Sequence, residues 1–263
     1  MAENSSACEQ VEGSKPQLVE TADVKPGQSL QLKPNVVPHN GTLFDFVESA
    51  PEQLVVDFFR QAIHHIEQTR RINDYHLKLK PSKRSGFIIE VFYGERREGP
   101  EKVEPDSCIS CNDSAPLFPG APGSVLAGEC VLRELSDQPY VQCSLDAKAR
   151  AGFIITPLRH VQKIGDLRDN ELFALWNVGV RALKNEGLSF RSMIVNQGSY
   201  RNLPHLHLKI WVDDHEYGRA VLRWSEEKRR LWAALQRSSS SPKKRPMCTL
   251  LQREGKCRFG DRC

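Results

Sequence analysis

The chain has no run of 18 or more apolar residues, the length from which a membrane-spanning helix is suspected. Its first residues, Met1-Ala-Glu-Asn-Ser-Ser, also lack the charged segment and apolar core of a secretory signal. We therefore expect a nuclear or cytoplasmic protein with no membrane partner. Without an export signal, the eight cysteines indicate free thiols and zinc ligands rather than disulfides.

Overall charge is also small, because the 263 residues carry a formal net charge of only +4. This value hides an asymmetry along the chain. Residues 219–263 contain 13 Lys and Arg against 4 Asp and Glu, which leaves +9 there and −5 in residues 1–218. Concentrated basic charge is typical of a surface that contacts a nucleic-acid backbone, so RNA is an expected partner.

Sustained periodicity is missing from residues 1–40, which are polar and are predicted to form a disordered arm. Residues 41–104 are predicted to form an extension of one helix and one strand. The helix is expected to start at Ser49, which can cap it, and the strand covers residues 86–93. Neither element belongs to the motifs described below.

Residues 112–124 are rich in proline and glycine and are predicted to form a loop. Beyond them, apolar and polar residues alternate as they do in strands. Strands are predicted at about 128–134, 139–145, 151–157, 190–196 and 204–212. Asp169 can cap a helix with apolar residues at helical spacing, and Gly187 can end it. The pattern predicts an α+β fold with a mainly antiparallel sheet, followed by a basic helix at 216–237 and a linker at 238–246.

Two histidines alternate with apolar residues near the end of this predicted domain. Alternation with a period of two predicts a half-buried strand, with the leucines on one face. His205, His207 and Lys209 would then share the other face, with neighbours about 7 Å apart. Three basic groups on one face suit a site that handles phosphate, although a solvated strand face gives the same pattern.

The order of four motifs resembles that of the histidine-triad (HIT) superfamily. The motifs are Cys108-x-x-Cys111, Pro157-x-x-His160, Asn196-x-Gly198 and His205-x-His207-x-Lys209. The resemblance covers residues 105–215 and implies a HIT-like antiparallel sheet with packed helices. Lys209 stands where the superfamily has its third histidine, a replacement that is similar to those of CwfJ-like RNA-processing proteins.

The resemblance also implies roles for individual residues. His207 would be the nucleophile that attacks the α-phosphorus of a nucleotide, and Lys209 would supply positive charge to the phosphoryl oxygens. As a lysine, Lys209 is not expected to move a proton near pH 7. Asn196, Ser199 and Asn202 would bind the ribose and phosphate, although Asn196 is equally a plain turn residue.

A zinc site is a further implication of the resemblance. Relatives with the C-x-x-C motif bind zinc through residues that correspond here to Cys108, Cys111, His160 and His205. This set of two cysteines and two histidines suits a closed structural site. The alternative is that both cysteines are free and His205 only orients its strand.

The C-terminal residues 247–263 contain a second cysteine pattern. Cys248-x8-Cys257-x5-Cys263 looks like a CCCH zinc finger, in which Phe259 is available to stack on a base. The family needs a histidine three residues after the last cysteine, but Cys263 is the last residue given. The sequence is then either a fragment or an incomplete finger, or these residues form a basic tail with chance cysteines.

Two hypotheses about function remain open at this point. In the first, the chain is a nucleotide hydrolase or nucleotidyl transferase that acts on a phosphoanhydride or an RNA end. In the second, a degenerate HIT-like domain and the finger together bind single-stranded RNA or a ribonucleoprotein partner without catalysis. The intact pair His205 and His207 favours the first hypothesis, and Lys209 favours the second.

Overall fold

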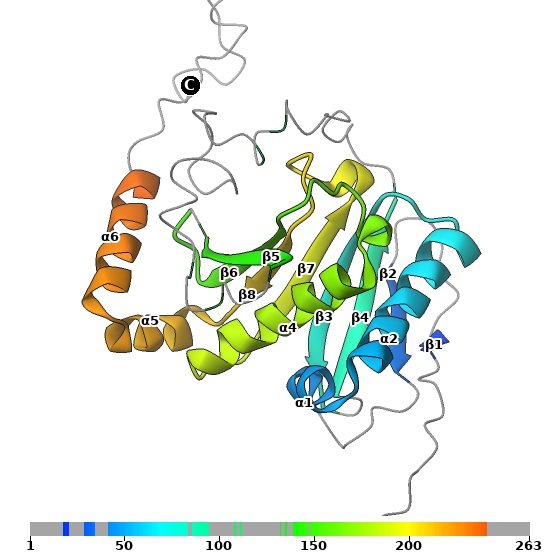
Figure 1. The fold of residues 1–263 in the computed structure, drawn as a ribbon, viewed down its shortest axis with the longest axis horizontal. Coiled ribbons are helices and arrows are strands. Elements are labelled where there is room, and N and C mark those ends of the chain that lie inside the picture. Colours follow the sequence, from blue (N-terminus) through cyan, green and yellow to red (C-terminus); the bar gives the residue numbers. More distant parts are fainter. Residues whose placement is uncertain are drawn as a thin grey trace, which may run out of the picture.

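The computed structural model describes residues 18–20, 29–34, 42–83, 86–94, 108, 111, 132, 135, 139–146 and 148–240. In this part of the chain, eight strands form one sheet in the order β1-β2-β4-β3-β7-β8-β6-β5. All neighbouring strands run antiparallel. The fold is therefore α+β with an antiparallel sheet, as predicted (Figure 1).

The strands are β1 (Leu18–Glu20), β2 (Ser29–Pro34), β3 (Tyr75–Ser82), β4 (Gly86–Tyr93), β5 (Val141–Leu145), β6 (Gly152–Pro157), β7 (Ser192–Gln197) and β8 (Leu208–Trp211). The helices are α1 (Leu43–Ser49), α2 (Glu52–His64), α4 (Asp169–Asn185), α5 (Asp214–Arg223) and α6 (Glu226–Ser240). Short helical turns are η1 (His65–Thr69), η4 (Ile164–Asp166) and η5 (Gly198–Tyr200).

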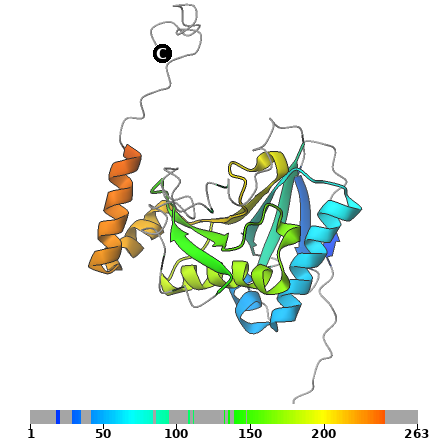
Figure 2. The ribbon, with the colours of Figure 1, turned by 45° about the horizontal axis from the view of Figure 1, so that its top comes forward.

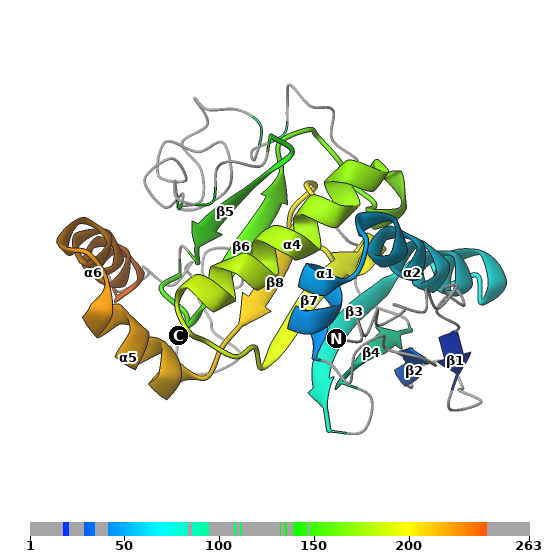
Figure 3. The same ribbon diagram turned by 60° about the horizontal axis from the view of Figure 1, so that its bottom comes forward.

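Alternate residues of the central strands build the hydrophobic core on one face of the sheet. One register row across this face, from β3 to β5, consists of Leu77, Val195, Leu208, Ile155 and Cys143, all at most 1% exposed. Helix α4 packs on β5 and β6, and α1 and α2 pack against α4. Figure 3 shows these three helices in front of the sheet. The site described below therefore lies on the second face.

Aromatic packing joins the helices to one another. Trp176 of α4 is fully buried and stacks on Phe59 of α2, with ring centroids 4.2 Å apart and planes 10° apart. Trp176 is therefore a core residue. Such a stacked pair adds about 0.5–1.5 kcal/mol beyond the area it buries.

Helix α4 ends close to the predicted glycine. Gly187 has φ +63°, and Leu188 N donates to Leu183 O at 2.9 Å, which closes the helix. The predicted cap at the other end is displaced by one residue, because Asp169 is the first helical residue. The capping position is Arg168, whose backbone N–H donates to the Glu171 carboxylate at 2.7 Å.

The predicted helix start at Ser49 is wrong. Ser49 is the last residue of α1, which begins after a reciprocal cap between Thr42 and Asp45. Pro51 then interrupts the chain, and α2 starts directly after it. Proline lacks a backbone N–H and has φ preset near −65°, so it separates two helices whose apolar residues read as one pattern.

The prediction of a disordered arm over residues 1–40 fails for residues 29–34. These residues form β2, which pairs with β4, and Leu30 and Leu32 are completely buried. Two leucines in alternation are too short a pattern to identify a strand. The exposed edge of β4 supplies the partner that orders them.

The predicted basic helix at 216–237 is in fact two helices, α5 and α6. Trp224 separates them in an extended conformation, with φ −65° and ψ 155°. Its ring packs between Tyr217 and Trp232, with centroids 5.4 and 6.1 Å away. Figures 1 and 2 show both helices at the end of the sheet where β5, β6 and β8 lie.

No helix in the described ranges combines the length and apolarity that crossing a membrane would require.

Candidate functional site

Two cysteines and two histidines from distant parts of the chain meet beside the end of β6 and the start of β8. Cys108 and Cys111 form a turn in which Cys111 N donates to Cys108 O at 3.0 Å. His160 follows β6 and His205 precedes β8. One ligand atom from each residue lies within 4.8 Å of the other three. The structure thus brings together the four residues for which a metal site was predicted.

The distances within this cluster suit a tetrahedral metal ion. Cys111 Sγ lies 3.2 Å from His205 Nδ1 and 3.3 Å from His160 Nδ1, and Cys108 Sγ lies 3.9 Å from His205 Nδ1. Zinc bonds of about 2.0–2.3 Å place tetrahedral ligand atoms about 3.3–3.8 Å apart. Because the four ligand atoms lie within 4.8 Å of one another, the most widely spaced of them would have to move closer to hold the ion.

A second contact prepares the His205 ring for this role. Its Nε2 lies 2.9 Å from Pro157 O, so that Nε2–H donates to the carbonyl and the Nδ1 lone pair faces the cysteines. Burial lowers the pKa of His205 to about 4, which keeps the ring neutral. Burial and the neighbouring Cys108 raise the pKa of Cys111 to about 12, and a bound cation would reverse that shift.

Strand β8 is shorter than the predicted strand at 204–212. It begins only at Leu208, so that His205 and His207 precede it. The His205 ring is instead only 3% exposed and faces the cysteines. His205 therefore does not continue a strand face with His207 and Lys209, as the alternation alone had predicted.

His207 is held in an orientation that leaves one ring nitrogen available. Its Nδ1 lies 3.0 Å from His205 O, so Nδ1–H donates to this carbonyl and Nε2 carries the lone pair. Burial and the nearby Lys209 charge lower the pKa of His207 to about 4. The half-buried ring is therefore a neutral imidazole near pH 7, which is the nucleophilic form.

Lys209 lies on the second face of the sheet, between Ile194 of β7 and Ile154 of β6. Burial and the neighbouring Arg150 lower its pKa to about 8, and the Asp146 carboxylate partly offsets this lowering. About a tenth of the side chain is then neutral at pH 7. The lowered pKa favours proton transfer by Lys209, and the expectation that it moves no proton near pH 7 stays a prediction.

The three residues predicted to bind the nucleotide have different environments. Asn196 is half-buried on β7, and its Oδ1 lies 2.8 Å from His76 Nδ1. The register of β7 with β8, continued by one residue, brings Asn196 beside His207. Ser199 N donates to the Asp74 carboxylate at 2.6 Å, in the turn η5. Asn202 is exposed in the loop before β8.

Sequence reasoning missed two polar residues, Arg150 near Lys209 and Thr156 near His207. The register of β6 with β8, continued by one residue, places Thr156 beside it. Thr156 Oγ1 is buried without a hydrogen-bond partner among the described residues. Arg150 precedes β6 and forms an ion pair with Asp146 at 2.6 Å. Thr156 lay within a predicted strand, but the alternation could not show which strand would lie next to it.

The cysteines of the predicted finger, Cys248, Cys257 and Cys263, lie outside the described residues. The predicted strand at 128–134 lies outside them as well, except for Leu132, whose N–H donates to Cys143 O at 2.8 Å.

Comparisons with known proteins give only weak similarities. No protein-family model matches the chain, and no curated protein matches it in sequence. Among solved structures, a uridylyltransferase is 15% identical, with a TM-score of 0.45, and the match covers 83% of this chain and 80% of that one. At this level a structural match concerns the arrangement of strands and helices only.

Two further structures come from Arabidopsis thaliana. A GALT-like protein is 13% identical with a TM-score of 0.47, over 76% of this chain and 74% of that one. An ADP-glucose phosphorylase with bound ADP-glucose is 12% identical with a TM-score of 0.41, over 70% and 63%. Because these scores are low, the function is argued below from the site itself.

Proposed function

We propose that the chain binds a nucleotide phosphate at His207 and Lys209 and transfers or hydrolyses it through a nucleotidyl-histidine. The observation that carries the proposal is the His207 ring. Its Nδ1–H is engaged by a backbone carbonyl, and the charge of the partly buried Lys209 acts on the ring. The motif resemblance to the HIT superfamily supports the same assignment.

The reaction has two steps. The Nε2 lone pair of His207 attacks the α-phosphorus, the N–P bond forms, and the P–O bond to the leaving group breaks. The leaving oxygen takes the bonding electrons and a proton. Water or another hydroxyl then attacks the phosphorus, loses its proton, and releases the imidazole. Splitting one displacement into two lowers each barrier.

Lys209 has two functions in this scheme. Its charged form stabilises the negative charge that develops on the phosphoryl oxygens. With a pKa of about 8, it also provides a proton to the leaving oxygen. The hydroxyl of Thr156, which is buried without a partner among the described residues, is suited to donate to a phosphoryl oxygen.

The test uses an adenosine phosphoramidate and a dinucleoside polyphosphate as substrates. His207→Ala should abolish covalent labelling by radioactive nucleotide, and Lys209→His should keep or raise turnover. Undiminished turnover in His207→Ala would place the chemistry elsewhere. Lys184→Gln serves as a control, because Lys184 forms an ion pair with Glu48 on the helical side of the sheet, away from His207.

A zinc ion in the cluster would fix the start of β8 and thereby the position of His207. We propose this role for Cys108, Cys111, His160 and His205. Metal analysis of the full chain tests it, because Cys108→Ser should remove one equivalent of zinc. Cys257→Ser should leave that equivalent in place. A loss of less than half an equivalent from folded Cys108→Ser protein would contradict the zinc site.

A second candidate function is that of a non-catalytic RNA-binding factor of the CwfJ-like type. The +9 charge of residues 219–263 favours it. RNA affinity should then fall steeply with salt, and Phe259→Ala should weaken it if the finger stacks on a base. Equal affinity after Phe259→Ala would leave only a basic tail. A ribonucleoprotein partner and a nuclear or cytoplasmic location remain predictions.

A further inference from the structure

A pocket of about 460 Å³ lies on the second face of the sheet, beyond Lys209. Its lining residues come from β3, β7, β8 and the segments beside them, and are Lys78, Arg150, Ala151, Arg191, Ser192, Ile194, Trp211, Val212 and Asp214. Ile194 is the register neighbour of Lys209, and Trp211 follows Lys209 on the same face of β8. The pocket therefore continues the surface that begins at His207.

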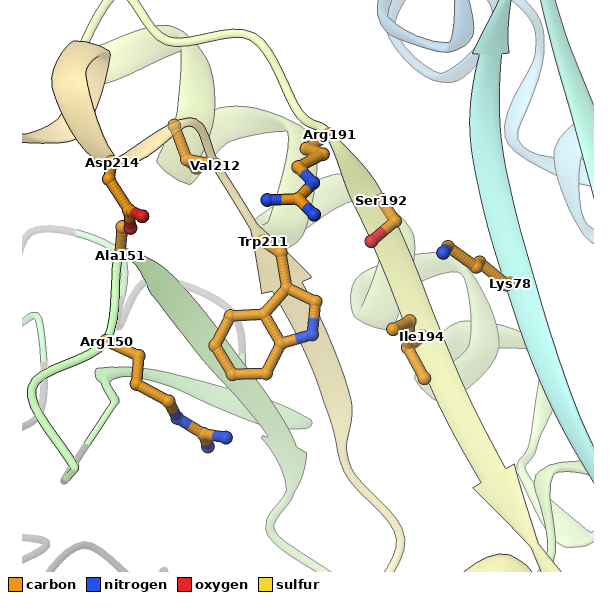
Figure 4. A pocket seen from close by; sticks show the side chains of 9 residues that line it. All are labelled: Lys78, Arg150, Ala151, Arg191, Ser192, Ile194, Trp211, Val212 and Asp214. Carbon is orange, nitrogen blue, oxygen red and sulfur yellow. The ribbon is translucent and has the colours of Figure 1, made fainter.

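The pocket is strongly cationic. Its lining includes three cations against one acid, Asp214, and Figure 4 shows Lys78, Arg150 and Arg191 around the Trp211 indole. Arg150 is paired with Asp146, but Lys78 and Arg191 repel each other unless an anion lies between them. Burial, together with the cations nearby, lowers the pKa of Lys78, as such repulsion requires.

Within the part of the chain that the structure describes, Lys78 and Arg191 lack the ion pairs that some other lysines form. Lys80, one position along the same face of β3, is paired with Glu90 at 2.5 Å, and Lys184 is paired with Glu48 at 2.8 Å. Lys78 and Arg191 form no side-chain hydrogen bond or ion pair with any residue in the described ranges. Their charges are therefore available to a ligand.

Arg150 and Trp211 form the opposite wall. The Arg150 guanidinium carbon lies over the indole ring, 4.4 Å from its centre. Planar guanidinium and aromatic groups are the surfaces on which unpaired bases stack. Cations for a phosphate thus lie beside a platform for a base, in a volume within the range of small-ligand sites.

The spacing along β8 decides what kind of ligand reaches this pocket. His207 and Trp211 are four residues apart, which corresponds to about 13 Å in an extended strand. Lys78 lies level with Lys209 through Ile194, whereas Arg191 lies beside Trp211. A single phosphate at His207 therefore does not reach Arg191, but a chain of nucleotides does. The +9 charge of residues 219–263 also suits a polyanion.

We propose that this pocket binds a further nucleotide of a single-stranded polynucleotide whose terminal phosphate lies at His207. Lys78 and Arg191 hold the backbone phosphate of that nucleotide, and its base stacks on Arg150 and Trp211. The inference rests on the proposed function, since it takes His207 as the position of the terminal phosphate. It identifies the substrate as an oligonucleotide end rather than a free nucleotide.

The test measures binding of the full chain to 5′-phosphorylated oligouridylates of two and eight nucleotides with a 3′-fluorescein, and to AMP by competition. Lys78→Gln and Arg191→Gln should each weaken octanucleotide binding at least five-fold. The slope of log affinity against log salt should fall by about 0.7 for each lost phosphate contact. AMP affinity should change by less than two-fold, and Lys78→Arg should restore octanucleotide binding.

Matched controls remove a positive charge elsewhere. Lys184→Gln and Arg230→Gln carry the same charge change at exposed ion pairs with Glu48 and Glu226. Both should leave octanucleotide affinity within two-fold of the unsubstituted protein. Thermal melts of all variants establish that the pocket substitutions leave the fold intact, because Lys78 and Arg191 have no protein partner to lose among the described residues.

Three results would overturn the inference. The first is an octanucleotide affinity and salt slope that equal those of the controls. The second is an equal loss for AMP and the octanucleotide, which would make the pocket part of a mononucleotide site. The third is weakened binding of a dinucleoside tetraphosphate alone, which would identify a small polyphosphate as the ligand. Labelling of His207 is measured separately, so failure of the proposed chemistry leaves these binding results interpretable.

Discussion

Replacement of Lys209 by methionine should stabilise the protein while it removes the proposed phosphate contact. The side chain lies partly buried between two isoleucines, and its pKa is lowered from 10.5 to about 8. That change corresponds to about 3 kcal/mol of unfavourable free energy for the charged form. Solvent screening of a half-buried group reduces it, so we expect Lys209→Met to gain about 1–2 kcal/mol at pH 7.

The gain should depend on pH in a defined direction. Below pH 8 the lysine is charged in both the folded and unfolded states, so the full cost is present. Between pH 8 and 10.5 the folded protein has lost this proton while the unfolded chain retains it, so the stability of the unsubstituted protein rises with pH. The advantage of Lys209→Met should therefore shrink over this interval.

Urea unfolding at pH 7 and pH 9.5 measures both effects. Lys184→Met is the control, because its exposed ion pair with Glu48 should contribute less than about 1 kcal/mol at either pH. Binding of AMP should weaken in Lys209→Met. Two results would refute a free-energy cost of burying the charged Lys209. One is a Lys209→Met protein less stable than the unsubstituted protein at pH 7. The other is a stability difference between the two proteins that is the same at both pH values.

Other substitutions test the packing that supports the site. Gly152→Ala would place a Cβ 2.0 Å from a backbone carbonyl oxygen, so it should lower the free energy of unfolding by about 3 kcal/mol. Gly218→Ala, with open space around it in α5, should raise the free energy of unfolding by about 0.5–1 kcal/mol. Gly198→Ala should lower the melting temperature, because φ is +57° and a carboxylate oxygen lies 2.0 Å from the new Cβ. Arg159→Met should cost about 3 kcal/mol by leaving the buried Glu171 carboxylate unpaired. The Arg159 hydrogen bond lowers the pKa of Glu171, so this stabilisation is present above pH 4.5 and is lost as pH falls. In urea unfolding, Arg159→Met should therefore lose less stability on acidification than the unsubstituted protein.

The two C-terminal helices show why a correct pattern can predict the wrong element. Apolar residues continue at helical spacing across Trp224, so the pattern indicates one helix. The indole instead turns inward between Tyr217 and Trp232, and the backbone at Trp224 extends. Ser225 accepts from Lys228 N at 3.3 Å and thus marks a second helix start that the sequence could have shown.

The motif resemblance predicted that Cys108, Cys111, His160 and His205 would form one group, and the structure brings these four residues together. What the alternation could not show is that His205 leaves the strand face to reach the cysteines. Alternate residues point to opposite faces of a sheet only within a paired strand, and β8 begins after His207. Tertiary contacts therefore separated two histidines that the pattern had put together.

The sequence by itself determined the α+β class and the buried faces of the central strands. These follow from local periodicity and from side-chain type, which act over a few residues. Only the tertiary structure decided the protonation of Lys209 and the existence of the basic pocket. Lys78 lies on β3 and Arg191 precedes β7, so their charges add only when the sheet forms. Electrostatic effects depend on distance and burial, and both are properties of the folded chain.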